Sequence, residues 1–142
     1  MTLYLDTSSL VKLYIEESGS DDVRQDLGDS AGGATSAVAY AEARLAFARL
    51  RREGKITADV FRSAKQDFDA DWPQYLVVEP TIGLCRAAGE LAERYRLRGF
   101  DSVHLATFLH LAREGAPAET RFSSFDRHLN RSARSALRSR RP

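Results

Sequence analysis

A short apolar run at residues 3–5, followed at once by a polar turn, constrains the fold of this chain more than any other feature. Leu3, Tyr4 and Leu5 do not alternate with polar residues, which is typical of a strand buried on both faces. Asp6 follows directly, and helical spacing of apolar residues begins at Leu10. Ligands of open α/β sheets bind at the carboxyl ends of the strands. Asp6 is therefore expected either to cap the first helix or to meet a cation at that edge.

Length and composition are those of one ordinary globular domain. The chain has 142 residues, of which 43% are hydrophobic and 29% are charged. It shows neither a signal peptide nor a membrane-spanning stretch, so we expect a cytoplasmic protein with no membrane association. The single cysteine, Cys85, excludes an internal disulfide and a cysteine-based zinc cage. It fits a reducing compartment, and we expect it to serve only in packing.

Strand and helix patterns alternate along the chain. Apolar periodicity, caps and breakers predict helices over about residues 20–27, 37–53, 57–70, 82–95 and 101–113, and further strands near residues 34–35, 76–80 and 120–124. This alternation predicts an α/β fold, a sandwich in which helices flank a small, mainly parallel central sheet. We expect one domain over residues 1–130. Residues 131–142 form an Arg-rich tail, either part of that domain or frayed.

Three further acids stand where a charge is costly. Glu42 lies on a helical face that is expected to point inward with Val38, Ala41, Leu45 and Ala48. Asp101 comes four residues before Leu105 and is expected to point inward from the first turn of its helix. Asp126 follows the last strand candidate, as Asp6 follows the first.

Four carboxylates that meet without a cation would repel one another strongly. Oxygen ligands without His or Cys suit Mg²⁺ or Mn²⁺ and not zinc. Such a cluster is the usual setting for metal-assisted hydrolysis of phosphodiesters, in which the ion activates a water and neutralises charge on the phosphate. Periodicity alone does not prove that the four acids converge.

Four segments, in order and spacing, carry a family resemblance. These are residues 5–14 with Asp6, residues 36–44 with Glu42, residues 98–106 with Asp101, and residues 123–129 with Asp126. Together they resemble PIN-domain ribonucleases, and more narrowly the VapC-type toxins of bacterial and archaeal toxin–antitoxin pairs. The resemblance covers nearly the whole chain. The departures are Ser124, where a Thr commonly stands, Leu129, where a Phe commonly stands, and the Arg-rich tail.

The resemblance implies a Mg²⁺-dependent endoribonuclease, with Mn²⁺ as a substitute, that cuts single-stranded or loop RNA. Asp6, Glu42 and Asp101 would hold one ion directly or through water, and Asp126 would add charge for it or for a second ion. Ser8 and Ser124 would orient ligands or water. The resemblance also implies a PIN-like fold, a homodimer, and a cognate antitoxin protein whose C-terminal segment covers the groove.

Other interpretations remain open. The phosphatase motif of haloacid dehalogenases also begins with an Asp after the first strand, but it needs a second Asp two residues on, where Ser8 stands. Asp101 and His104 have the spacing of carboxylate-bridged metal bundles, yet the chain holds no second such pair, and His104 is expected to be a packed or hydrogen-bonded helix residue. A PIN-fold module that binds RNA or protein without nuclease activity is the main alternative function.

The basic tail is the last distinctive feature. The chain carries a net charge of +1, but residues 127–142 hold six arginines and no acid, which leaves −5 on the remainder. The arginines at 127, 131, 134, 138 and 141 have a three-four spacing that would place them on one face of a helix. Ala133 and Leu137 could pack the opposite side. We expect this face either to hold RNA or to be a mobile solubilising end.

Overall fold

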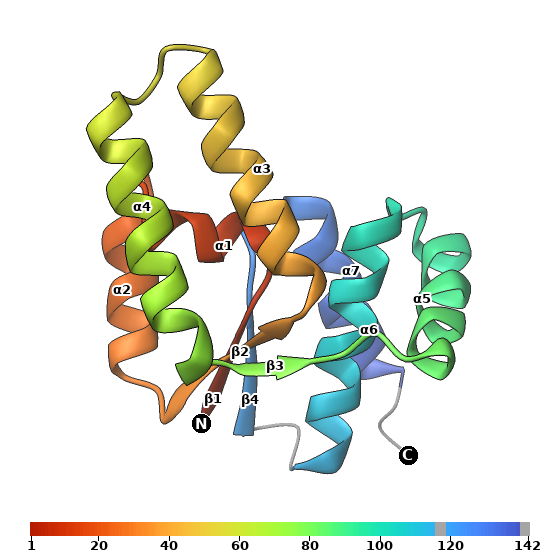
Figure 1. The fold of residues 1–142 in the computed structure, drawn as a ribbon. Helices are drawn as coiled ribbons and strands as arrows, with labels where there is room; N and C mark the ends of the chain where they lie inside the picture. The colour runs from red at the N-terminus through yellow and green to blue at the C-terminus, as the bar shows by residue number, and fades with distance from the viewer. Residues whose placement is uncertain (116–118, 140–142) are drawn as a thin grey trace.

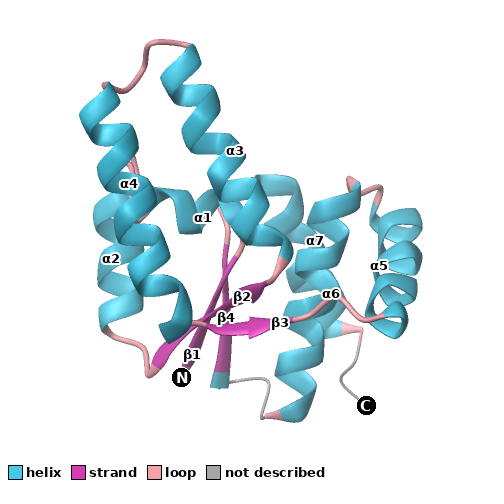
Figure 2. Ribbon diagram, in the orientation of Figure 1, coloured by secondary structure: helices cyan, strands magenta, loops and turns pink. Residues whose placement is uncertain are grey.

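A computed structural model describes residues 1–115 and 119–139 and shows a parallel four-stranded sheet between two layers of helices (Figure 1 and Figure 2). The strands are β1 (Thr2–Leu5), β2 (Gly32–Ser36), β3 (Leu76–Val78) and β4 (Thr120–Ser123). Their order in the sheet is β3-β2-β1-β4, and every neighbouring pair is parallel. The predicted α/β/α sandwich with a small parallel sheet is confirmed.

β1 is a central strand with side chains buried on both faces, as its unbroken apolar run predicts. Leu3 and Leu5 pack into one core and Tyr4 into the other. The first layer contains α1 (Thr7–Lys12), α2 (Ser20–Gly28), α3 (Val38–Arg52) and α4 (Ala58–Asp71), and a short 3₁₀ turn, η1 (Trp72–Gln74), leads into β3. The second layer contains α5 (Ile82–Tyr95), α6 (Gly99–Glu114) and α7 (Arg127–Arg138).

Helix boundaries follow local signals in the sequence. Thr57 and Thr81 cap α4 and α5, because each side chain accepts a hydrogen bond from the backbone N–H three residues on. Gly54, just beyond α3, has a φ of +70°, a conformation that favours glycine at the end of a helix. The helices expected over residues 20–27, 37–53, 57–70, 82–95 and 101–113 are therefore confirmed as α2 to α6, with ends that shift by no more than two residues.

The prediction of which face of α3 points inward is wrong. Leu45 is 53% exposed, while Ala39, Ala43 and Phe47 are buried. Small and apolar residues lie on most sides of α3, so its periodicity fits more than one face. Packing of Phe47 against Phe68 of α4 selects the observed face. Glu42 is consequently half-buried at the flank of the buried face instead of at its centre.

Cys85 was expected to be a packing residue, and this too is wrong, because it is exposed. α5 packs mainly against α6, with Ala88 as its one fully buried residue, so most of its surface faces solvent. Between residues 1 and 115 and between 119 and 139, no helix has the length and apolar character needed to cross a membrane.

The Arg-rich end of the chain forms α7 as far as Arg138. Ala133 is buried and Leu137 is partly buried against the second layer, which confirms that these residues pack against the body. Two arginines of the tail, Arg140 and Arg141, lie outside the described residues. The division of the chain at residue 130 stays a prediction, although α7 runs across that point.

Candidate active site

Parallel pairing of β1 and β4 brings Asp6 and Asp126 to the same edge of the sheet. Leu5 lies opposite Ser123, and each acid follows its strand within three residues. Asp6 caps α1 by accepting the Ser9 N–H at Oδ1 over 3.0 Å. Asp126 caps α7 by accepting the Leu129 N–H at Oδ1 over 2.9 Å. The capping role expected for Asp6 is thus confirmed, and it places a carboxylate at the ligand-binding edge at the same time.

Ser8 and Ser124 tie these two strand ends together. The Ser8 hydroxyl donates to Asp6 Oδ1 at 2.7 Å and accepts the Phe125 N–H at 3.0 Å. The Ser124 hydroxyl accepts the Asp126 N–H at 3.0 Å. Asp6 is only 4% exposed, and this burial raises its pKa, although hydrogen bonds from Ser124, Ser8 and the Ser9 N–H partly oppose the shift.

Glu42 is held by a buried chain of hydrogen bonds that links α3 to β1 and α6. Its Oε1 accepts from the Thr7 hydroxyl at 2.6 Å and lies 2.9 Å from His104 Nε2. A carboxylate oxygen can only accept, so Nε2–H is the donor. His104 Nδ1 lies 2.8 Å from the hydroxyl of Tyr4. Burial alone would raise the pKa of Glu42, but the hydrogen bonds from His104 and Thr7 outweigh it and hold the pKa below its usual value.

The sequence did not reveal the roles of Thr7 and Tyr4 in this chain of hydrogen bonds. His104 was expected to be packed or hydrogen-bonded, which is confirmed, since it is 1% exposed and bonded at both ring nitrogens. The available signal was its place three residues after Asp101 on one helix. Its partner Tyr4 is 100 residues away in the chain, a distance that no local pattern can bridge.

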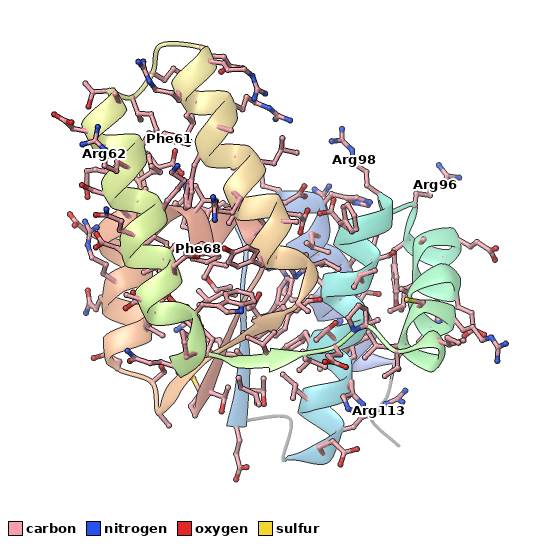
Figure 3. All side chains as sticks on the ribbon, in the orientation of Figure 1. Phe61, Arg62, Phe68, Arg96, Arg98 and Arg113 are labelled. Atoms are coloured by element: carbon pink, nitrogen blue, oxygen red, sulfur yellow. The ribbon has the colours of Figure 1, made fainter. Side chains whose placement is uncertain are left out.

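Asp101 lies in the first turn of α6 and lines an open hollow of about 700 Å³ together with Glu42 and Asp126. Arg98 and Phe100 line the same hollow, and Arg98 projects away from the start of α6 (Figure 3). No described residue gives Asp101 a side-chain hydrogen bond or an ion pair.

The pKa of Asp101 is raised by burial and then by the negative charges of Asp126 and Asp6, with a smaller opposing effect of His104 and a further rise from Glu42. The predicted acids therefore lie close enough to repel one another. Glu42, Asp101 and Asp126 line one hollow, and Asp6, which does not line it, lies close enough to Asp101 for its charge to act on that carboxyl.

The donor set suits a hard cation, although the carboxylates are not gathered into a finished cage. Among residues 1–115 and 119–139, no three acidic, His or Cys side chains form a ready-made metal site. Glu42 and Asp126 accept hydrogen bonds from described residues through one carboxylate oxygen each, Oε1 and Oδ1. Their second oxygens, and both oxygens of Asp101, are available to a Mg²⁺-like ion, which would have to draw the carboxylates closer.

Comparison with known proteins identifies the family. A model of the PIN domain matches residues 3–134. The chain belongs to the PIN-domain family. Two ribonucleases of Mycobacterium tuberculosis, VapC45 of strain CDC 1551 / Oshkosh and VapC49 of strain ATCC 25618 / H37Rv, are each 34% identical to it over 135 residues. In both cases the aligned region covers 94% of this chain and 90% of the relative. The resemblance to VapC-type PIN proteins is therefore confirmed, and the relatives' names support an enzyme of the ribonuclease class.

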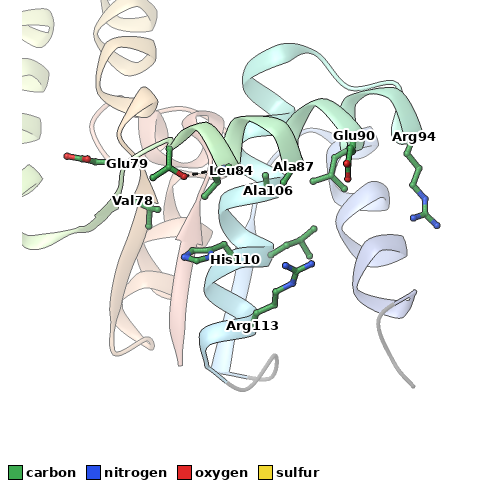
Figure 4. Close-up of a pocket in the computed structure, with 13 residues that line it drawn as sticks. Val78, Glu79, Leu84, Ala87, Glu90, Arg94, Ala106, His110 and Arg113 are labelled. Carbon is green, nitrogen blue, oxygen red and sulfur yellow. Dashed lines mark hydrogen bonds between the residues drawn. The ribbon is translucent and has the colours of Figure 1, made fainter.

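The PIN match contains every expected site residue, since the first, Asp6, and the last, Asp126, both fall within residues 3–134. A second hollow, of about 620 Å³, lies between α5 and α6 (Figure 4). It is lined by charged residues of both signs, among them Glu90, Arg94 and Arg113, and by none of the four acids. The hollow that contains Asp101 is accordingly the candidate active site of this PIN domain.

Proposed function

We propose that this PIN-domain protein is a Mg²⁺-dependent endoribonuclease, with Mn²⁺ as a substitute, and the cytoplasmic toxin of a toxin–antitoxin pair. The main support for a metal-dependent reaction is the environment of Asp101. This residue is a half-buried carboxylate in an open hollow, repelled by three other acids and given no hydrogen-bond donor or cation by the described residues. A divalent cation would relieve that repulsion. The similarity to proteins named ribonucleases supports RNA as the substrate.

The four acids have distinct parts in this proposal. Asp6, Glu42 and Asp101 would hold the ion directly or through water, and Asp126 would add negative charge for it or for a second ion. When bound, the ion supplies an activated water and neutralises charge on the phosphate.

The surrounding residues hold these carboxylates in place. Thr7 and His104 fix Glu42 by one oxygen, so that the other remains available. Ser8 and Ser124 fix the strand ends that carry Asp6 and Asp126. Such outer contacts orient metal ligands and raise metal affinity. The Arg98 guanidinium, at the rim of the hollow, would hold an RNA phosphate.

Two protein partners belong to the proposal. An acidic hollow should attract a basic antitoxin segment, one that presents an Arg to the carboxylates in place of the metal. We also propose a homodimer. Co-expression with the product of the adjacent reading frame would test the first, because the two chains should co-purify without RNA cleavage. Light scattering on the purified chain would test the second, and a monomer would contradict it.

Metal removal distinguishes the nuclease from a PIN-fold module that only binds RNA or protein. We expect an end-labelled single-stranded RNA to be cut in Mg²⁺, to remain intact in excess EDTA, and to be cut again when Mg²⁺ or Mn²⁺ is restored. Circular dichroism in EDTA is the control, since the fold should persist without metal. Cleavage that continues in EDTA would contradict the metal mechanism. RNA that is bound but never cut, with or without metal, would favour the binding module.

A further inference from the structure

The outer face of α7 carries a row of four exposed arginines, which we call the arginine row: Arg127, Arg131, Arg134 and Arg138. At 3.6 residues per turn these positions fall within about 60° of the helix circumference and span about 16 Å of its length. The opposite face is buried through Leu129, Ala133 and Ala136. The row is therefore presented on a packed helix and not on a frayed end.

The arginine row has no acidic partner in the part of the chain that the structure describes. α7 contains no acidic residue, and none of its arginines forms an ion pair with residues 1–115 or 119–139. Other arginines of the same molecule are paired, for example Arg24 with Glu16 and Arg62 with Asp59. A row of unpaired cations on a rigid support is an electrostatic footprint for an extended anion.

The arginine row also starts at the candidate active site. Asp126, which lines the hollow, is the N-cap of α7, and Arg127 is the first residue of the helix. From that point, the row leads away along the outer face of the helix.

We propose that the arginine row holds the phosphate backbone of the RNA on one side of the cleavage site. This inference rests on the proposed ribonuclease function. The charge favours RNA over the basic antitoxin segment proposed above, which the row would repel. Arginine suits this part because its planar guanidinium binds phosphate with two parallel hydrogen bonds. Contacts to phosphate alone would hold RNA of any sequence and would weaken as salt is raised.

The test compares two triple substitutions that remove the same charge. Arg131, Arg134 and Arg138 are changed to Gln in one variant, and Arg49, Arg51 and Arg52 at the far end of α3 in the other. Both carry Asp6→Asn so that the RNA is not cut. Fluorescence anisotropy with a single-stranded RNA is measured at several salt concentrations.

The row variant should bind more weakly, and the slope of log affinity against log salt should flatten by about 0.7 per lost contact, or about 2 in all. Its loss of affinity between 50 and 200 mM salt should then be about 20-fold smaller than that of the α3 control. Equal affinities and equal slopes in the two variants would overturn the inference. The same result is expected if the arginine row binds a protein instead of RNA. A parent that binds no RNA would contradict the proposed function itself.

Phe100 is 56% exposed although it is large and apolar. It lines the hollow beside Asp101, and the cation of Arg98 stands two residues before it. Unpaired bases of RNA stack on exposed aromatic rings, whereas bases within a duplex are not available for such contact. We propose that Phe100 stacks an unpaired base next to the cleaved phosphate. This also rests on the proposed function and would give the site its preference for single-stranded RNA.

Phe100→Leu keeps an apolar side chain and removes the aromatic face, while Phe100→Trp restores one. In the Asp6→Asn parent, 2-aminopurine is placed at successive positions of a single-stranded RNA, and its fluorescence should be quenched on binding at one or more of them. Phe100→Leu should abolish that quenching and weaken binding by about 5- to 150-fold. Phe100→Trp should recover both.

Ile82→Ala, at an exposed position of α5 outside the hollow, is the matched control and should behave as the parent. All variants should share one melting temperature. Quenching and affinity that are unchanged in Phe100→Leu would overturn the inference, whereas a parent that binds no RNA would contradict the proposed function.

Discussion

Asp101→Asn should lower RNA cleavage by at least about 100-fold, because loss of an outer contact to a metal ligand already costs 10- to 100-fold. The same change should leave the metal-free protein at least as stable as the wild type. Asp101 is repelled by Asp126, Asp6 and Glu42, and the amide has no charge to repel. The gain in unfolding free energy should stay below about 1 kcal/mol, since the carboxyl is half exposed and water screens it.

The size of that gain depends on pH. The pKa of Asp101 is raised in the folded protein from its ordinary value of 3.8, so the folded state binds a proton more tightly than the unfolded chain. The stability that the protonated Asp101 carboxyl contributes to the wild-type protein is then present below about pH 4. It is lost as the pH rises through the pKa of Asp101 in the folded protein. Without metal, the melting-temperature advantage of Asp101→Asn should be near zero at pH 4 and largest at pH 7.

An exposed acid on α4 supplies the control for both effects. Asp67→Asn removes the same charge from an exposed site away from the hollow, and it should retain cleavage and melt at pH 7 as the wild type does. Full activity in Asp101→Asn, or an equal gain in both variants, would contradict the role given to Asp101.

His104→Ala should destabilise the protein by about 3 kcal/mol. The substitution opens a cavity at a fully buried position, removes the ring nitrogen that meets the hydroxyl of Tyr4, and leaves Glu42 Oε1 with Thr7 alone. Since Glu42 loses one of the two groups that orient it, affinity for Mn²⁺ should also fall by about 10- to 100-fold. Urea denaturation and calorimetric titration at a temperature where the variant is folded measure the two effects.

Two conservative variants separate positioning from simple loss of structure. His104→Gln can place an amide N–H near the position of Nε2 and should recover part of the Mn²⁺ affinity. Tyr4→Phe removes only the hydroxyl that meets Nδ1, and should cost about 1–2 kcal/mol of stability. Wild-type Mn²⁺ affinity in folded His104→Ala would show that His104 does not position Glu42.

Local chemistry in the sequence predicted much of this fold and of the candidate site. The apolar run before Asp6, the caps Thr57 and Thr81 and the breaker Gly54 act over a few residues, and their elements lie where they were expected. The meeting of Asp6 and Asp126 followed from one topological rule, since parallel strands deliver their carboxyl ends to a single edge, whereas Glu42 and Asp101 reach the hollow from helices.

Contacts between segments far apart in the chain determine the features that local sequence patterns did not predict. The buried face of α3 depends on which helices pack against it, and Phe68 of α4 selected Phe47 instead of Leu45. The link from Tyr4 through His104 to Glu42 joins three elements far apart in the chain. Cys85 is exposed because α5 is the outer helix of its layer, a position that composition does not reveal.

Calorimetric titration of Mn²⁺ into the full chain shows whether four carboxylates of this fold converge on a divalent ion. We expect saturable binding to the wild type and to Asp67→Asn. Binding should be weakened by at least about 10-fold in Asp101→Asn and in Asp6→Asn. Equal Mn²⁺ affinity in all four proteins, or no binding to the wild type, would contradict that convergence.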